Sequence, residues 1–339
     1  MPTGPPDSYG RGIRLPWAGL PAEVRGWVAG QLGGTVTEVE DRVGGFSPGC
    51  AAVVATGRRR GFVKAVSDRP NATSLELYRR ERDRFAALPD HPALPKPLAG
   101  TDLTVAGVPW TVTLFPALPG QPPAHPWTEQ QARLVFDRWG ELSRSLVAHD
   151  GAGLPDSSEL VGFFDRWPEL LGDADDPWSV RPWVRERAER LVAGAERVQR
   201  EVVGSTPAHT DLRADNVLVG EPVGDAEPPV WFVDWAEART AAAWVDPALL
   251  AADLVVSGAD RAQGGQLDVR GFLAEHPTTS GIDPELLGHL LAALAATLHR
   301  LSRRPAPPGL PTIRDWQARC AERLLGFLSR DLGPPDRLW

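Results

Sequence analysis

Residues 209–216 read His-Thr-Asp-Leu-Arg-Ala-Asp-Asn, and residues 233–235 read Val-Asp-Trp. A short apolar run at 217–219 follows the first stretch, and a second run at 230–233 leads into the other, so the pattern predicts a loop followed by a β-hairpin. Phosphoryl transfer from a nucleotide needs a carboxylate beside the attacking hydroxyl and oxygen ligands for Mg²⁺. Asp211, Asn216 and Asp234 supply such a set.

These three side chains have a simpler interpretation. Asp211 and Asn216 could cap turns, and Asp234 could merely end a strand. The flanking strands favour phosphoryl transfer, because they place the three groups in the context that this mechanism requires. For His209 we expect a hydrogen bond that braces the loop rather than a catalytic role.

The sequence of the first third of the chain predicts a short helix over 21–30 and a small antiparallel sheet with a longer helix. Runs at 35–43, 51–56, 61–66 and 110–115 have strand patterns, and 74–88 has a helical one. Lys64 lies on the strand face shared with Phe62 and Val66. Winding the helix at about 100° per residue places Glu81 on its apolar face and Glu76 on the opposite one. A strand lysine paired with a helix glutamate holds nucleotide phosphates in kinase-like folds.

The segment 43–49 ahead of Lys64 is rich in glycine and lies between two predicted strands. Gly44, Gly45 and Ser47 are candidates for contact with nucleotide phosphates, because backbone N–H groups of such a loop can face anions. An ordinary hairpin turn is the alternative interpretation.

The Pro- and Gly-rich stretch 116–126 separates two predicted lobes. We expect a nucleotide-binding lobe over 1–115, with 1–20 as a loose lead-in, and a catalytic and substrate-binding lobe over 116–339. Helical patterns at 128–147, 182–203, 246–257, 284–303 and 312–331 make the second lobe mainly helical, with 151–180 irregular. The fold class is therefore α+β.

From about residue 35 onward, the order and spacing of these motifs resemble the aminoglycoside phosphotransferase family, small-molecule kinases built like protein kinases. The resemblance implies a two-lobe kinase-like fold, ATP or GTP as phosphoryl donor and Mg²⁺ as cofactor. It also implies that Asp211 orients or deprotonates the substrate hydroxyl and that Asn216 and Asp234 bind the metal. Arg213 stands where protein kinases carry a phosphate-contacting lysine, so its guanidinium could neutralise charge on the γ-phosphate.

Other positions follow from the same resemblance. The link that contains Phe115 and Ala117 should pass the adenine, with main-chain groups reading its edge. Thr210 stands where relatives usually have glycine. Asp246 and Asp253 resemble the family's aspartates downstream of the metal motif, with helix capping as their alternative role.

Composition limits the class of protein. The 339 residues carry a formal net charge of −8, so we expect neither nucleic acid nor membrane surface as a partner. Two distant cysteines give no zinc-ligand spacing and no disulfide framework, and neither a secretory signal nor a membrane-spanning run is present, which fits a cytoplasmic protein. All but two of the 36 basic residues are arginine, a bias typical of a GC-rich bacterial genome. The expected partners are a nucleotide and a small molecule, with the chain a monomer or homodimer.

Three functions fit this pattern. The first is O-phosphorylation of a small hydroxylated molecule such as an aminoglycoside or related antibiotic, which would confer antibiotic resistance. The second is a metabolic kinase of an amino alcohol, choline-like compound or sugar, and the third is a nucleotide-binding pseudokinase with a regulatory role. An acidic group at Asp173, Asp175 and Asp176 either attracts a cationic substrate or forms a solvated loop, and the second reading is favoured.

Overall fold

The computed structural model describes residues 13–42, 45–224, 226–261 and 267–330. These residues divide into two compact units: unit 1 takes those of 1–122, 215–237 and 306–313, and unit 2 takes those of 123–214, 238–305 and 314–339. The lobes expected from the sequence are continuous segments that meet at 115/116, whereas this division assigns two later segments to unit 1. The boundary of the functional lobes stays a prediction.

Unit 1 is built on a five-stranded antiparallel sheet in the order β1-β2-β3-β5-β4. β4 was not among the predicted strands, and its side chains alternate between half-buried and exposed. β4 and β5 are joined by Ala106 and Gly107, which both have positive φ, as a tight hairpin turn requires. The strands are β1 (Val36–Asp41), β2 (Cys50–Thr56), β3 (Arg60–Ser67), β4 (Ala99–Val105) and β5 (Val108–Pro116).

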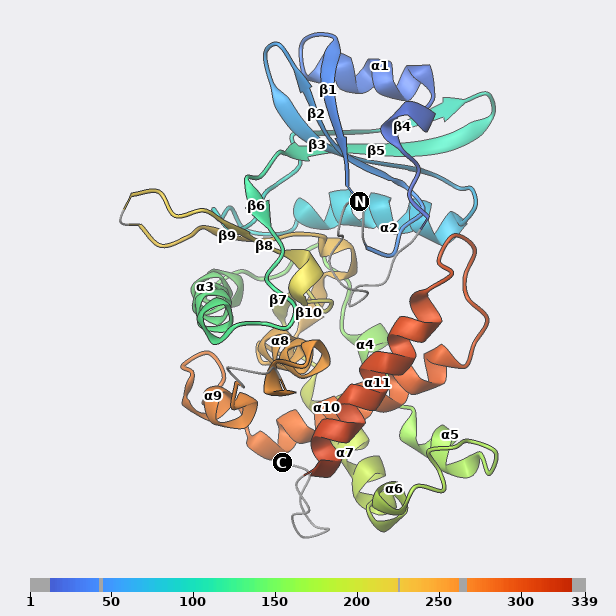
Figure 1. Ribbon diagram of the computed structural model, residues 1–339, viewed down its shortest axis with the longest axis vertical. Helices are drawn as coiled ribbons and strands as arrows, with labels where there is room; N and C mark the ends of the chain where they lie inside the picture. Colours follow the sequence, from blue (N-terminus) through green and yellow to red (C-terminus); the bar gives the residue numbers. More distant parts are fainter. Residues whose placement is uncertain (1–12, 43–44, 225, 262–266, 331–339) are drawn as a thin grey trace. The chain divides into compact units, whose positions relative to one another are not determined.

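The two faces of this sheet are covered by different helices (Figure 1). The two-residue period of β3 sends Val63 and Ala65 into the core beneath α1, and sends Lys64 and Val66 to the face that α2 covers. The direction expected for Lys64 is therefore the observed one. The covering elements are η1 (Trp17–Gly19), α1 (Ala22–Gln31) and α2 (Ala72–Phe85).

Residues 13–20 differ from the loose lead-in that the sequence suggests. The N–H of Ile13 donates to the carbonyl of Gly309 (3.0 Å) and that of Leu15 to the carbonyl of Pro48 (3.3 Å). Trp17 is only 7% exposed and joins the core of the sheet. Burial of this large side chain offsets the entropy cost of ordering a Pro- and Gly-rich segment.

A three-stranded sheet in the order β6-β8-β9 also belongs to unit 1. Its β8–β9 hairpin is the one expected from the two apolar runs after residue 216. The elements are β6 (Gly120–Gln121), β8 (Val217–Gly220) and β9 (Val230–Phe232), with the 3₁₀ turns η2 (Ala214–Asn216) and η3 (Trp235–Glu237) at the ends of the hairpin.

Unit 2 is mainly helical, as predicted, and has one two-stranded sheet, β7 (Thr206–Ala208) with β10 (Arg239–Ala241). Two expectations need correction: 151–180 contains α4 and α5 rather than only irregular chain, and the helix expected over 182–203 is interrupted at Arg187. Trp139, Trp167 and Trp178 are fully buried, so these aromatics fill the core. The helices are α3 (Glu129–Val147), α4 (Ser158–Phe163), α5 (Trp167–Gly172), α6 (Pro182–Glu186), α7 (Ala188–Glu201), α8 (Val245–Ser257), η4 (Ala259–Arg261), α9 (Val269–Glu275), α10 (Pro284–Ser302) and α11 (Ile313–Arg330).

Within the described ranges, every helix is too short or too polar to cross a lipid bilayer.

Candidate active site

Lys64 of unit 1 lies between two carboxylates. Its Nζ is 2.5 Å from Oε2 of Glu81 and 3.2 Å from Oδ1 of Asp234. The side chains of Lys64 and Glu81 are 10% and 3% exposed, whereas that of Asp234 is 46% exposed. A buried ammonium needs such partners, and the half-exposed Asp234 carboxylate is the member of the group that faces solvent. Three of the predicted site residues are thus brought together.

The local sequence explains why Glu81 faces inward. Helix α2 begins after Asn71, whose side chain caps the helix by accepting from the N–H of Thr73 (3.0 Å). From there the helical period buries Tyr78 and Glu81 and leaves Glu76 58% exposed beside Arg79. The helix therefore carries one buried and one exposed glutamate, as the sequence pattern predicts.

Electrostatics couples these three groups. Burial raises the pKa of Glu81 from 4.5 to about 7, although Lys64 acts to lower it, and the charge of Asp234 adds to the rise. Burial acts to lower the pKa of Lys64, but the negative charges of Asp234 and Glu81 outweigh it and leave that pKa above its ordinary value. Two carboxylates share one ammonium, so the group carries surplus negative charge until it binds a cation or a proton.

The β8–β9 hairpin positions Asn216 and Asp234 at the same end. The N–H of Val233 donates to the carbonyl of Asn216 (2.9 Å), one step beyond the pairing of Val217 with Phe232. Asp234 has φ of 63°, a left-handed conformation that non-glycine residues seldom adopt. The indole N–H of Trp235 donates to the carbonyl of Phe232 (2.9 Å) and helps to hold this turn. Strain of this kind gathers at functional sites.

The donor set at this end of the hairpin fits Mg²⁺. Asn216 offers an amide oxygen and Asp234 a half-exposed carboxylate, and Mg²⁺ prefers oxygen ligands, few from the protein and the rest from phosphates and water. Among the residues that the structure describes, there is no cluster of three or more His, Cys, Asp and Glu side chains able to hold a metal.

The described part of the glycine-rich loop is Gly45–Gly49, and Gly44 lies outside the described residues. Gly45 has φ of 72°, which explains the need for glycine there. Ser47 hydrogen-bonds through Oγ to the hydroxyl of Tyr78 (2.7 Å) and accepts from the N–H of Gly49 (3.1 Å). The loop is therefore tied to α2, a contact that the sequence analysis did not include.

Phe115 and Ala117 lie at and just beyond the end of β5. Phe115 is buried, pairs with Phe62 of β3, and its ring packs edge-on against Phe85 at 5.7 Å. Its side chain is thus part of the core, and any contact with adenine would come from its main chain. Ala117 is half-buried in the segment that follows. Their role in adenine binding stays a prediction.

In unit 2, two aspartates of α8 hold the loop 209–214. Asp246 accepts from the N–H groups of His209 and Thr210 (2.8 Å each), and Asp253 accepts from the N–H of Ala214 (3.0 Å). Burial raises the pKa of both carboxyls. These contacts are not helix caps, because the carboxylate oxygens accept hydrogen bonds from N–H groups of the loop. Asp246 and Asp253 are two helical turns apart in the sequence, and this spacing indicates that both lie on one face of the helix.

Thr210 has φ of 59° in this loop. That conformation favours glycine and penalises a β-branched residue, which gives a physical reason for the glycine that the resemblance leads one to expect there. The ring of His209 is buried, and its Nδ1 accepts from the N–H of Asp211 (3.3 Å). His209 thus braces the loop in the way that the sequence suggests.

Asp211 and Arg213 project from the same loop. Arg213 Nε lies 3.3 Å from Oδ1 of Asp211, and the guanidinium lies over the ring of Trp316 at 4.9 Å. The Asp211 side chain is 45% exposed and that of Arg213 is 18% exposed. A carboxylate open to solvent beside a held cation can orient a hydroxyl and stabilise negative charge. Trp316, which lies on α11, was not among the residues predicted for the site.

The acidic group 173–176 is neither an open cation site nor a simple solvated loop. Asp176 is fully buried and lies 2.8 Å from Nε2 of His299, while Arg300 contacts both Asp176 (3.2 Å) and Asp173 (3.0 Å). In Figure 1 the flanking α5 and α6 lie at the opposite end of unit 2 from β7, which leads into Asp211. Asp173 and Asp176 are neutralised within unit 2, so two of the three aspartates are not available for an acidic subsite.

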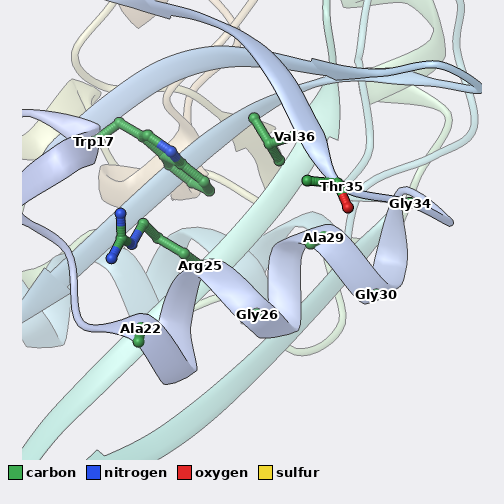
Figure 2. Close-up of a pocket in the computed structure, with 9 residues that line it drawn as sticks. All are labelled: Trp17, Ala22, Arg25, Gly26, Ala29, Gly30, Gly34, Thr35 and Val36. Carbon is green, nitrogen blue, oxygen red and sulfur yellow. The ribbon is translucent and has the colours of Figure 1, made fainter.

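An open surface hollow of about 570 Å³ lies between α1 and the start of β1 (Figure 2). Arg25 extends from α1 toward Trp17 along one side of it. None of the predicted site residues lines this hollow. Its lining residues are Trp17, Ala22, Arg25, Gly26, Ala29, Gly30, Gly34, Thr35 and Val36.

Solved structures share this fold. Spectinomycin phosphotransferase APH(9)-Ia, in complex with ADP and spectinomycin, is 12% identical over 89% of this chain and 97% of that one, with a TM-score of 0.55. The GDP and kanamycin complex of APH(2")-IIia is 16% identical over 88% and 96%, with a TM-score of 0.56. A microcompartment-associated aminopropanol kinase is 14% identical over 89% and 95%, with a TM-score of 0.53. At these identities the likeness shows a common fold.

Among curated protein sequences there is no significant match. The profile of the phosphotransferase enzyme family matches residues 43–279, a span that includes Lys64, Glu81, Asp211, Asn216 and Asp234. Since this match covers more than half of the sequence, the chain belongs to the phosphotransferase enzyme family and is a phosphotransferase with a kinase-like fold.

Proposed function

We propose that this phosphotransferase moves the γ-phosphoryl group of ATP or GTP to a hydroxyl group of a small molecule. The observation that carries the proposal is the position of Lys64, whose ammonium lies between buried Glu81 and half-exposed Asp234. A buried cation that lies between a buried and a half-exposed carboxylate is suited to receive nucleotide phosphates at the exposed end of the group.

Each of the proposed site residues has a separate task in this reaction. Asp211 accepts a hydrogen bond from the acceptor hydroxyl and takes its proton as the oxygen bonds to the γ-phosphorus, while the bond from that phosphorus to the β–γ bridging oxygen breaks. Arg213, held over Trp316, offers positive charge to the phosphoryl oxygens. Lys64 binds the phosphates that remain on the nucleotide.

Asn216 and Asp234 are the residues that would hold Mg²⁺. When bound, this ion neutralises phosphate charge and helps to align the nucleotide. The surplus negative charge around Lys64 supports the assignment, because it favours a cation at the exposed side of Asp234.

The acceptor class is the open part of the proposal. Two of the similar structures are named for antibiotic phosphotransferases and one for an aminopropanol kinase. The neutralised group at Asp173 and Asp176 gives no support to a polycationic acceptor. Amino alcohols, choline-like compounds and sugars are therefore tested beside aminoglycosides.

Both cysteines are buried free thiols, which supports a reducing cytoplasm as the compartment.

The test is phosphate transfer from γ-labelled ATP and GTP, with and without Mg²⁺, across aminoglycosides, macrolides, nucleosides, amino alcohols and sugars. We expect one acceptor class to be phosphorylated by the wild type, and Asp211→Ala to bind nucleotide without transfer. Lys64→Met should lose nucleotide binding, whereas Lys96→Met, which removes only a surface ion pair with Asp90, should not. Nucleotide binding with no transfer to any class would favour the pseudokinase, and unchanged turnover in Asp211→Ala would remove that residue from the mechanism.

A further inference from the structure

Tyr78 joins two parts of unit 1 that the proposed function assigns to the nucleotide. Its side chain is 5% exposed and lies on the inward face of α2, one turn before Glu81. Its hydroxyl is 2.7 Å from Oγ of Ser47 in the glycine-rich loop, and its ring lies 4.9 Å beneath Nζ of Lys64. One side chain therefore contacts both the loop and the lysine.

The glycine-rich loop packs closely against this tyrosine at Gly49. A Cβ added to Gly49 would lie 2.9 Å from the Tyr78 hydroxyl oxygen and 2.8 Å from the carbonyl oxygen of Ala65. Only glycine permits the loop backbone to approach the hydroxyl so closely. The contact between Ser47 and Tyr78 thus depends on close packing of the loop backbone at Gly49.

Arg14 supplies a third contact at the same hydroxyl. Its Nη1 donates to the Tyr78 oxygen (3.2 Å), and the residues on either side of it are held by the backbone bonds of Ile13 and Leu15. Because the guanidinium can only donate, the phenol oxygen acts as acceptor toward Arg14 and its own hydrogen is available for Ser47. Arg14 comes from the segment that the sequence suggested to be a loose lead-in.

This arrangement favours one hydrogen-bonding role for Ser47, because the phenol oxygen already accepts from Arg14. Its Oγ accepts from the N–H of Gly49 (3.1 Å) and, in this orientation, from the hydroxyl of Tyr78. With both lone pairs used, the remaining polar group of Ser47 is its own O–H, a donor. A donor on the described part of the glycine-rich loop suits a phosphate oxygen, as does the lysine above the tyrosine ring.

We propose, on the basis of the proposed function, that Tyr78 is a positioning residue for the nucleotide phosphates: its hydroxyl orients Ser47 as a donor and its ring supports Lys64. The alternative is that Tyr78 only fills the core, in which case phenylalanine would serve equally well. Tyr78→Phe separates the two roles, because it keeps the ring and removes the hydroxyl.

We expect Tyr78→Phe to raise the nucleotide Kd by roughly 10-fold, the usual effect of losing one hydrogen bond to a charged ligand, with the acceptor KM unchanged. Ser47→Ala should have the same effect, and the double variant should be no worse than either single variant, since both remove one coupled interaction. Tyr9→Phe makes the identical chemical change at the other tyrosine of the sequence and is the control. Equal Kd values for wild type and Tyr78→Phe would overturn the proposal.

A second measurement keeps the test valid if Tyr78→Phe unfolds. With only two tyrosines in the chain, 3-fluorotyrosine labelling of Tyr9→Phe leaves a single ¹⁹F resonance, that of Tyr78. We expect this resonance to shift as ADP and Mg²⁺ are added, with the same Kd as calorimetry gives. A resonance that does not move while calorimetry shows binding would refute the role of Tyr78 alone. Absence of nucleotide binding to the wild type would instead refute the proposed function.

Discussion

Glu81→Gln should change how the stability of the protein depends on pH. In the folded protein, burial raises the pKa of Glu81 from its ordinary value of 4.5 to about 7. That difference corresponds to about 3 kcal/mol, at roughly 1.4 kcal/mol per pH unit. Because the folded-state pKa is above the unfolded-state pKa, the contribution is present in full below pH 4.5 and is lost as the pH rises to about 7. The glutamine variant has no such titration.

The assay is urea unfolding of wild type and Glu81→Gln at half-unit steps from pH 4.5 to pH 8. We expect the free energy of unfolding of the wild type, relative to the variant, to fall by about 3 kcal/mol across this range. Glu76→Gln, on the exposed face of the same helix, is the matched control and should follow the wild type within about 0.5 kcal/mol at every pH. If the difference in free energy of unfolding between wild type and Glu81→Gln stays constant across this pH range, burial does not raise the pKa of Glu81 as argued.

Three further predictions use the same protein. Thr210→Gly should raise the free energy of unfolding by about 1 kcal/mol, because glycine relieves the positive φ of a β-branched residue; a lower urea midpoint would contradict this. Asp253→Ala should lower kcat at least about 10-fold and leave the nucleotide Kd unchanged, since Ala214 loses its acceptor; steady-state kinetics and calorimetry give the two values. An acyl-phosphate nucleotide probe should modify Lys64 and not Lys96, read by peptide mass spectrometry, with equal labelling as the opposing result.

The features that the sequence predicted are those that depend on local periodicity. The two-residue period of β3 places Lys64 on the α2 face, and the helical period of α2 turns Glu81 toward it. Asp234 follows from the hairpin pattern, since a strand must end where the polar residues begin. In each case a few neighbouring residues determine the direction of the side chain, so no knowledge of the tertiary fold was needed.

The features that sequence reasoning missed depend on partners far along the chain. The burial of Asp176 requires His299 and Arg300, which lie on α10, more than a hundred residues away. The contact between Ser47 and Tyr78 depends on how the glycine-rich loop packs on α2. No periodic pattern connects such residues, and each alone resembles an ordinary loop or core residue.

The two halves of the proposed machinery are held by independent means. The division between the compact units falls after Ala214, inside the 209–216 stretch. Before that point, Asp246 and Asp253 of α8 hold the loop that bears Asp211. After it, the hairpin of unit 1 holds the residues that accompany Lys64. Substitutions in unit 1 should therefore act first on nucleotide affinity, and substitutions that loosen the α8 anchors should act first on turnover, a separation that kcat and Kd measure directly.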